Sequence, residues 1–471
     1  MALLLVAVIS VSTLAFGAVY PWAFLPLFAA AAVIGIAGVI RGGVPRPLRA
    51  PAAALGAAWI VAALQLAPLP IPVIEAISPK TAEILRVYTL LFTTSPEEWL
   101  PLSLNPRSTS LAVLALGALS LYAIGLPRLL DGRTLRTLPP TLAIFAVPLA
   151  LFGIYSLAHN DGLIYGFWRP QDGGGHNQAG PFINRNHFAG WMLMTACLLA
   201  GWCVGQIERE LSRHRHHRWR AFEWWSSGEA NGLLLTGAAT FTAVIALFWV
   251  VSRSAIVGFS GGACLFAWMM LSRRRLAGRR RTAGVLVLGA LLLTGIAWRG
   301  PDYLLARFQD ESHLVGRWGA WRDGLAAARD FPIFGTGLNT YSDAMLFYQT
   351  SSSDVHFAQA HNDYVQLVTE GGILLFAAAA AAAGFLIRAI RRNIRAAQHE
   401  ARGYWIRAGA AIGMCSIAIQ EIFEFSLQIP ANAFLFCTLA AIALTPVSSE
   451  GPHGPRDTIE PTMDSVGDPL P

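Results

Sequence analysis

Long runs of apolar residues constrain this sequence most strongly, because each is long enough to cross a membrane. A transmembrane helix needs about 20 predominantly apolar residues, and about twelve such runs occur. They fall at about 2–19, 22–40, 50–68, 108–127, 139–158, 187–206, 232–251, 254–272, 283–298, 371–390, 404–423 and 429–446. Only 13% of the residues are charged, against roughly 25% in soluble domains, which excludes a water-soluble globular enzyme. We therefore expect an all-α, polytopic membrane protein with about 12 transmembrane helices.

The distribution of basic residues predicts the orientation. Most of the 35 lysines and arginines lie in connections on the same side as the N-terminus, as the positive-inside rule requires if both termini are cytoplasmic. The formal charge of +7 therefore reports topology, and we expect membrane lipids, not nucleic acid, as partners. No Lys or Arg precedes Arg41, so the first run is expected to be a helix and not a secretory signal. Residues 1–446 are expected to form one membrane domain, and 447–471 a disordered cytoplasmic tail.

The longest outside segment, 299–370, is predicted to be a large periplasmic loop that contains short interfacial helices. Ser312 can cap a helix that runs to about Asp330, with apolar residues at helical spacing along one face. Such a helix is suited to lie on the membrane surface. Proline and glycines then break the chain, and a second helix is predicted over about 358–370, with His361 on it.

Polar side chains at the outer ends of the apolar runs are the candidate functional residues, because an ionisable group there has to be useful or paired. Arginine presents a planar fork of donors that matches phosphate oxygens, and histidine can take a hydroxyl proton near neutral pH. The candidate catalytic residues are His361, Arg253 and Arg317, and the candidate pyrophosphate- or glycan-binding residues are Arg185, Asn186, His187, Arg322, Asn362 and Tyr364. Their spacing is not that of a metal site, so no metal is expected. The chemistry indicated is electrostatic: cations stabilise a departing phosphate while a base aligns an acceptor hydroxyl.

Taken in order, these stretches resemble the O-antigen ligase and O-antigen polymerase family of bacterial membrane proteins. The resemblance covers about 100 to 445. The matching pieces are Leu102-Ser103-Leu104-Asn105 to Thr109, Asn184-Arg185-Asn186-His187, Ser252-Arg253-Ser254, Gly316-Arg317 to Trp321, Pro332-Ile333-Phe334-Gly335-Thr336-Gly337, Ala360-His361-Asn362-Asp363-Tyr364 to Glu370-Gly371-Gly372, and Gln428-Ile429-Pro430-Ala431-Asn432. Each piece alone is weak, and the ordered set is what carries the resemblance.

The resemblance implies a glycosyltransferase of the inner membrane that works on the periplasmic side. Such proteins pass a glycan from undecaprenyl pyrophosphate to an acceptor hydroxyl, with inversion and without a nucleotide sugar, metal or other cofactor. The acceptor is the lipid A core in the ligase and another carrier-linked glycan in the polymerase. By position, Arg185, Arg253 and Arg317 look like pyrophosphate ligands, and His361 looks like the residue that orients or deprotonates the acceptor.

Two alternatives to the ligase stay open. The histidine stretch matches ligase-type members, which favours that reaction, but a polymerase of O-antigen or exopolysaccharide needs the same donor chemistry. A transporter of a lipid-linked glycan would also need many spans, with its binding groups near mid-membrane on broken helices. The deeply placed acids here, Glu421 and Glu424, lie at the outer end of the eleventh run, and the other candidates are external.

Overall fold

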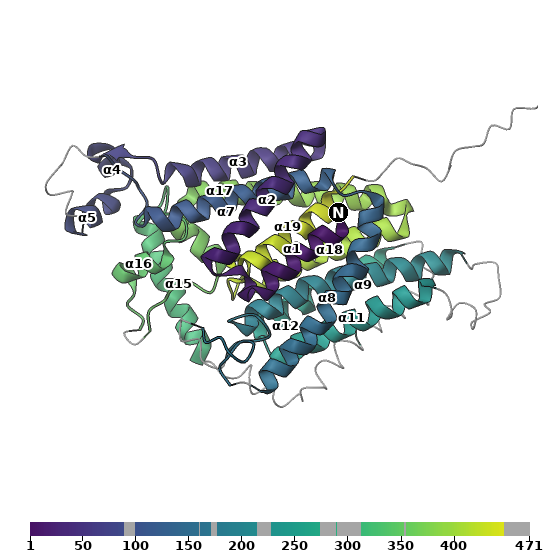
Figure 1. Cartoon of the computed structure of the whole chain (residues 1–471). Coiled ribbons are helices and arrows are strands. Elements are labelled where there is room, and N and C mark those ends of the chain that lie inside the picture. Colours follow the sequence, from purple (N-terminus) through teal and green to yellow (C-terminus); the bar gives the residue numbers. More distant parts are fainter. Residues whose placement is uncertain are drawn as a thin grey trace, which may run out of the picture.

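The computed structural model describes residues 1–88, 99–159, 161–170, 177–213, 228–273, 289, 312–352 and 355–446, and this part of the chain is mostly helical. Long helices run side by side in one bundle, and several of the shorter elements gather at one of its ends (Figure 1). The longer helices are α1 (Ala2–Leu14), α2 (Pro21–Gly42), α3 (Arg49–Leu64), α7 (Pro106–Gly125), α8 (Gly132–Ala158), α9 (Arg185–Arg213), α11 (Gly228–Val250), α12 (Arg253–Ser272), α15 (Ser312–Asp330), α17 (Asp363–Ala396), α18 (Ala401–Gln420) and α19 (Pro430–Leu444). The shorter elements are β1 (Leu69–Pro70), α4 (Ile71–Ile77), α5 (Pro79–Tyr88), β2 (Trp99–Leu100), α16 (Tyr341–Tyr348) and the 3-10 turns η1 (Phe16–Ala18), η2 (Arg46–Leu48), η3 (Leu126–Arg128), η4 (Ala397–His399) and η5 (Ser426–Gln428).

Among the described helices, eight are long and apolar enough to cross a membrane: α2, α3 with η2, α7 with η3, α8, α9, α11, α12, and α17 with η4. The apolar helices α1 and α19 are shorter, and α18 corresponds to the predicted run at 404–423. The chain is therefore a multi-pass membrane protein. The total of about twelve spans stays a prediction. The predicted span at 283–298 and the predicted tail at 447–471 lie outside the described residues.

Polar side chains cap several helices where the sequence leaves the apolar runs. The Asp131 carboxylate accepts a hydrogen bond from the Thr134 amide (2.6 Å) at the start of α8. Ser252 accepts one from the Ala255 amide (3.4 Å) at the start of α12. Because the first amides of a helix have no partner within the helix, such caps define where it begins.

The centre of the bundle is the antiparallel pair α9 and α18. Trp191 and Trp405 are fully buried there. Gly201 and Gly409 let the two backbones approach closely, since a Cβ atom at Gly201 would lie 2.4 Å from the carbonyl oxygen of Trp405. Small residues at such crossings are typical of membrane helices, because van der Waals contact between backbones holds them together. The pairing brings the start of α9 and the end of α18 to the same end of the bundle.

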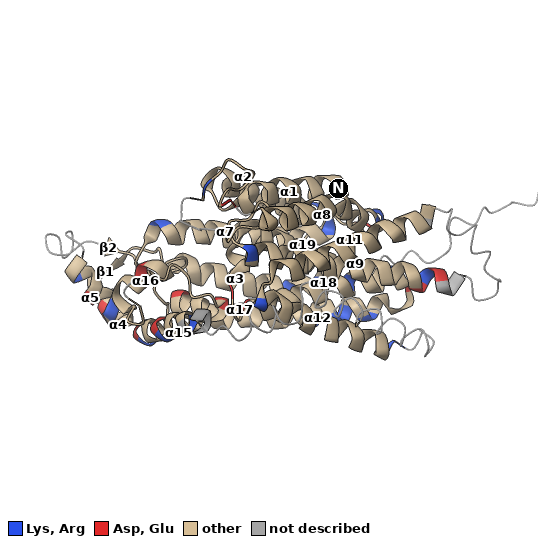
Figure 2. Ribbon diagram, turned by 90° about the horizontal axis from the view of Figure 1, so that it is seen from below, with Lys and Arg blue, Asp and Glu red and all other residues tan. Residues whose placement is uncertain are grey.

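Charged side chains concentrate toward the two ends of the bundle, and the ribbon between them is mostly uncharged (Figure 2). At one end lie α4, α5, α15 and α16, with β1 and β2 paired antiparallel through Leu69 and Leu100. At the other end, Arg273 and Glu208 form a buried ion pair (2.6 Å), to which the Trp405 indole also donates (2.6 Å). An apolar middle between two polar ends is the charge pattern of a protein that spans a bilayer.

The structure confirms one helix predicted in the 299–370 segment and corrects the other. Helix α15 has the predicted bounds, Ser312–Asp330. The second helix, α17, begins at Asp363 and not near 358, so His361 lies outside it. The reason is the backbone of the two preceding residues: His361 has φ of 51° and Asn362 is extended, with φ of −163°. A left-handed residue cannot continue a right-handed helix.

Candidate functional site

Glu424 is the centre of the candidate site, where three separate parts of the chain reach one carboxylate. It lies between α18 and α19 and is 0% exposed. Arg317 of α15 forms an ion pair with its Oε1 atom, to which Asn186 Nδ2 of α9 also donates a hydrogen bond (2.6 Å). The imidazole of His361 approaches the other carboxylate oxygen, with 3.5 Å between Nδ1 and Oε2.

Glu424 is held in its ionised form. Burial alone would raise the pKa of the carboxyl, but His361 and the guanidinium of Arg317 outweigh it and hold the pKa below its ordinary value. A negative charge is therefore fixed at the meeting point of α9, α15 and the loop before α17.

His361 is oriented by this carboxylate. Its Nδ1 atom is buried on the side of Glu424, whereas the side chain as a whole is 37% exposed. The remainder of the ring, including Nε2, is therefore the part that a second molecule can approach. A carboxylate against one nitrogen of an imidazole fixes the ring orientation and favours a proton on that nitrogen, which leaves the other as acceptor.

His187 is a second imidazole beside the same loop, but it is buried. Its ring centroid lies 4.6 Å from that of Phe425, and the ring of His361 lies 4.9 Å from Phe425. The side-chain amide of Asn432 donates to the His187 carbonyl (3.0 Å), which ties the start of α19 to α9. His187 thus packs behind the site, and only His361 presents part of its ring to the outside.

Arg185 is the first residue of α9, and a contact of the next residue, Asn186, shows at which end of the bundle it lies. The side-chain amide of Gln420, at the end of α18, donates to the carbonyl of Asn186 (3.0 Å). The half-buried Arg185 therefore lies at the same end of the bundle as Glu424.

Arg253 is the first residue of α12, and the packing of α12 against α18 places it at the end of the bundle that holds Glu424. A Cβ atom at Gly258 would lie 2.5 Å from the Ser416 carbonyl oxygen, and one at Gly262 would meet the Ser416 side chain and Ile412, so α12 and α18 are antiparallel. Five residues before Gly258, Arg253 lies about 7.5 Å farther along, beyond the level of Ser416 toward the end of α18. Arg185, Arg253 and Arg317 are thus contributed by three helices at one end of the bundle.

Asn362 and Tyr364 hold the helices around the site in place. The side-chain oxygen of Asn362 accepts from the amides of Tyr364 and Val365 (both 3.0 Å), so it caps α17. The hydroxyl of Tyr364 donates to the Ala418 carbonyl (2.7 Å) and joins α17 to α18. The cap and the hydrogen bond to Ala418 fix the loop that contains His361.

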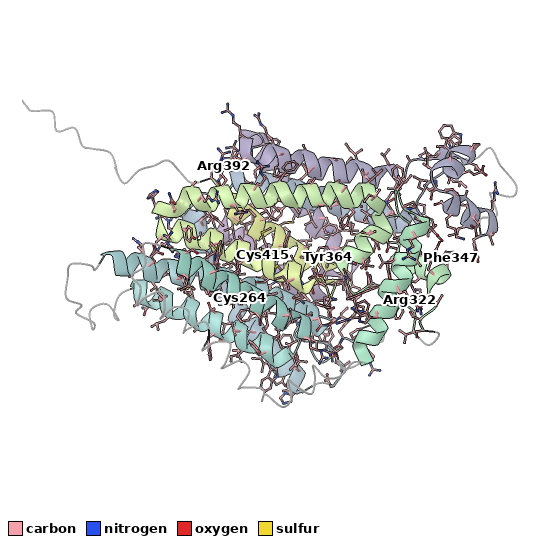
Figure 3. The ribbon with its side chains drawn as sticks, turned by 180° about the vertical axis from the view of Figure 1, so that it is seen from behind. Cys264, Arg322, Phe347, Tyr364, Arg392 and Cys415 are labelled. Carbon is pink, nitrogen blue, oxygen red and sulfur yellow. The ribbon has the colours of Figure 1, made fainter. Side chains whose placement is uncertain are left out.

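Arg322 does not join the cluster around Glu424. Its side chain is 69% exposed, donates to the Thr350 hydroxyl (3.0 Å) and lies 3.6 Å from Asp323. Arg317 and Arg322 are five residues apart on α15, which places them on different faces of the helix. Figure 3 labels Arg322 on α15 and Tyr364 at the start of α17, with Arg392 toward the far end of that helix.

Glu370 anchors the short segments that surround the site to α17. It is buried and accepts hydrogen bonds from the amides of Asn339 (2.7 Å) and Tyr341 (3.0 Å) and from the side chain of Gln366 (2.9 Å). Gln65, just after α3, donates to the Glu370 carbonyl (2.8 Å). The region near the end of α3, the 332–341 segment and α17 are therefore one hydrogen-bonded unit.

Two glycines allow this unit to close. Gly335 and Gly372 have φ of 72° and 59°, and the second produces a kink inside α17. A Cβ atom at Gly372 would lie 2.4 Å from the carbonyl oxygen of Ile333. Only glycine fits at such a position, because it combines left-handed backbone with close contact between main chains. This explains one glycine in each of the Pro-Ile-Phe-Gly-Thr-Gly and Glu-Gly-Gly stretches, Gly335 and Gly372.

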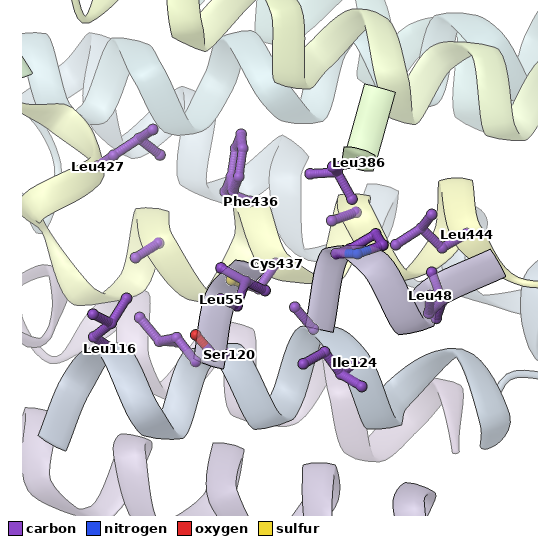
Figure 4. Close-up of a pocket in the computed structure, with 15 residues that line it drawn as sticks. Leu48, Leu55, Leu116, Ser120, Ile124, Leu386, Leu427, Phe436, Cys437 and Leu444 are labelled. Carbon is purple, nitrogen blue, oxygen red and sulfur yellow. The ribbon is translucent and has the colours of Figure 1, made fainter. Parts of the chain in front are cut away.

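An apolar cavity of about 270 Å³ lies between α3, α7, α17 and α19, and one of its ends is near the site (Figure 4). Leu427, in η5, lines it, and the next residue, Gln428, donates from its side chain to Asp363 (2.6 Å) at the start of α17. From there the cavity reaches Leu48 and Leu444. It is suited to an aliphatic chain, since its lining is almost wholly hydrocarbon.

Sequence reasoning missed the central role of Glu424. It placed Glu421 and Glu424 at the outer end of the eleventh run and considered them only for the transporter alternative. The signal was there, because a carboxylate next to an apolar helix is costly unless it is paired. Which groups pair with it could not be read, since Asn186 and Arg317 are 238 and 107 residues away in the chain.

The comparison with family models addresses much of the same part of the chain. Residues 238–380 match the family model described as "O-Antigen ligase". This range includes Arg253, Arg317, Arg322 and the His361 loop, and it excludes Asn186 and Glu424.

A curated relative is similar to part of the sequence. The chain is 28% identical over 157 residues to the "Exopolysaccharide production protein ExoQ" of Rhizobium meliloti (strain 1021). The match covers 31% of this chain and 34% of the relative, about a third of the length of each. The family match contains four of the seven stretches on which the sequence resemblance depends, including those with Arg253, Arg317 and His361. Residues 238–380 of this multi-pass membrane protein are accordingly similar to the O-antigen ligase family.

Proposed function

We propose that the chain is a membrane glycosyltransferase that transfers a glycan from undecaprenyl pyrophosphate to an acceptor hydroxyl. The observation that carries the proposal is the buried Glu424 carboxylate, which joins a partly exposed imidazole, His361, to a guanidinium, Arg317. A base beside a cation is the minimum that this transfer requires. The O-antigen ligase family match supports the reaction class.

In the proposed step, Nε2 of His361 takes the proton of the acceptor hydroxyl. The hydroxyl oxygen then forms a bond to the anomeric carbon, while the bond from that carbon to the pyrophosphate oxygen breaks. The pyrophosphate leaves with the bonding electron pair, still attached to its lipid, and the anomeric centre is inverted. Glu424 stabilises the imidazolium that forms, as a buried carboxylate does in other acid–base sites.

Arg317, Arg253 and Arg185 are proposed to bind the pyrophosphate. Guanidinium groups match phosphate oxygens bidentately and keep their charge at all relevant pH values. The starts of α9, α12 and α17 lie at the same end of the bundle, and helix N-termini favour an anion. We propose that the apolar cavity near Leu427 receives part of the lipid chain.

The acceptor distinguishes two forms of the proposal. The ligase form, with a lipid A core acceptor, agrees with the description of the matched family. The polymerase form, with a carrier-linked glycan acceptor, agrees with the name of the exopolysaccharide relative. In both, we place the protein in the bacterial inner membrane with cytoplasmic termini and a periplasmic site, on the basis of the arginine distribution.

The test is transfer in vitro by the purified protein, with a defined lipid-linked donor and either acceptor. We expect new glycosidic bonds with one acceptor and a loss of about 10²–10⁴-fold in rate for His361→Ala. His356→Ala is the matched control, because His356 is exposed and bonds Ser342 (2.9 Å) away from Glu424. Full activity of the His361 variant would contradict the proposed base. Movement of the donor across vesicles without bond formation would indicate the transporter instead.

A further inference from the structure

A second cavity, polar and of about 560 Å³, lies at the end of the bundle opposite Glu424. It is lined where α8 and α18 begin and α19 ends, and helix α18 connects the two regions. With 20 residues, α18 is about 30 Å long, which is the thickness of the hydrocarbon core of a bilayer. The cavity and the candidate active site therefore lie at opposite faces of the membrane.

The cavity carries an excess of positive charge. Its lining includes Arg133, Arg136, Arg402 and Arg407 but only two carboxylates, Asp131 and Glu400. The Asp131 carboxylate is engaged as the cap of α8. Two formal positive charges thus remain without a compensating acid in the lining.

The arginines of the cavity differ in whether their guanidinium groups are already hydrogen-bonded within the protein. Arg407 is buried, and its guanidinium donates to the carbonyls of Thr445 (3.0 Å) and Gly403 (2.8 Å), so it closes the end of α19. By contrast, Arg133 and Arg136 are exposed, and Arg136 donates only through Nε, to the Gly132 carbonyl (2.9 Å). Within the described part of the chain, neither the guanidinium of Arg133 nor the terminal nitrogens of Arg136 have a hydrogen-bonding or ion-pair partner.

We infer that this cavity binds a phosphate-bearing anion, supplied by the head group of an anionic phospholipid or by free phosphate. A basic pocket between transmembrane helices at the head-group level is the kind of site that binds such lipids. Its volume is in the range of small-ligand sites, about 300–1,000 Å³. Bound there, the phosphate would neutralise Arg133 and Arg136 and join the start of α8 to the start of α18. The inference does not depend on the proposed transferase activity.

The experiment measures the melting temperature of the purified protein in a zwitterionic detergent during titration with dioleoyl phosphatidylglycerol. Parallel titrations use phosphatidylcholine and inorganic phosphate. An anion that binds the folded state raises the melting temperature in a concentration-dependent way. We expect Arg133→Ala/Arg136→Ala to weaken the apparent affinity about thirtyfold. Each basic residue near an anionic lipid contributes about five- to sixfold to the affinity, and two residues are removed.

The matched control is Arg391→Ala/Arg392→Ala, which removes two exposed arginines toward the far end of α17 and outside the cavity lining (Figure 3). It is expected to retain wild-type affinity, and Arg133→Lys/Arg136→Lys to retain most of it. Stabilisation by phosphatidylglycerol alone identifies the lipid as the source, and stabilisation by inorganic phosphate identifies the free anion. Equal loss in the cavity and control variants, or no stabilisation by either anion, would overturn the inference.

Discussion

Replacement of Glu424 by Gln tests the centre of the site most directly. Glutamine has nearly the same shape, but it lacks the charge that pairs with Arg317 and orients His361. Its amide can donate to Nδ1 of His361, which would move the imidazole proton to Nε2 and remove the proposed acceptor. The comparable change in a Ser-His-Asp triad costs about 10⁴ in rate for this reason. We expect kcat to fall by about 10²–10⁴, the range of a general base, with little change in KM for the acceptor.

The same variant should also lose stability. Removing one partner of a fully buried ion pair costs about 3–5 kcal/mol, but Arg317 is 18% exposed and keeps some hydration. We therefore expect a loss of about 1–3 kcal/mol at neutral pH. The assays are single-turnover transfer with purified protein and thermal unfolding, with Glu83→Gln as the control because Glu83 is exposed. A transfer rate within about threefold of wild type would refute the orienting role of Glu424, since even a weak general base contributes more.

Further predictions concern pH, the contact between α15 and the loop after α16, the kink of α17, and the indole that supports the His361 loop. The pKa of Glu424 is below its ordinary value, so its stabilisation is present above about pH 4.3 and is lost as the pH falls through the lower folded-state pKa; thermal unfolding of wild type and Glu424→Gln should therefore converge in acid. Asp323 accepts from the amides and hydroxyls of Thr350 and Ser351, so Asp323→Asn should cost about 1–3 kcal/mol and raise hydrogen exchange at both amides; unchanged exchange would argue against this role. Gly372→Ala should lower stability by about 1–3 kcal/mol because of its φ of 59°, whereas Gly384→Ala, where a Cβ meets nothing within 4 Å, should not; equal melting temperatures would contradict the proposed strain. Trp321→Phe removes the hydrogen bond to the Ala360 carbonyl (2.8 Å), which supports the His361 loop. We expect kcat to fall while the melting temperature changes little, because the loop loses its position and not its fold; transfer kinetics and thermal unfolding of the same variant test this.

The sequence predicted the helical membrane fold because that fold depends on local properties. Apolar runs of about 20 residues must form helices in a bilayer, where backbone groups have no other partners. The bounds of α15 were also predicted closely, because the cap residue Ser312 and the helical spacing that follows it are local signals. The start of α17 was placed too early, because the left-handed backbone of His361 is set by its tertiary contacts and leaves no periodic signal in the sequence.

The site divides in the same way. The residue types that suit phosphate and proton chemistry, Arg185, Arg253, Arg317 and His361, could be picked out from their positions beside apolar runs. Their relation to Glu424 could not, because the pairing joins α9, α15, the loop before α17 and the end of α18, which only the packing of the bundle brings together. Local sequence determines which segments enter the membrane, since that depends on each segment's own transfer free energy. Tertiary packing decides which charge neutralises which, since that depends on distances between segments far apart in the chain.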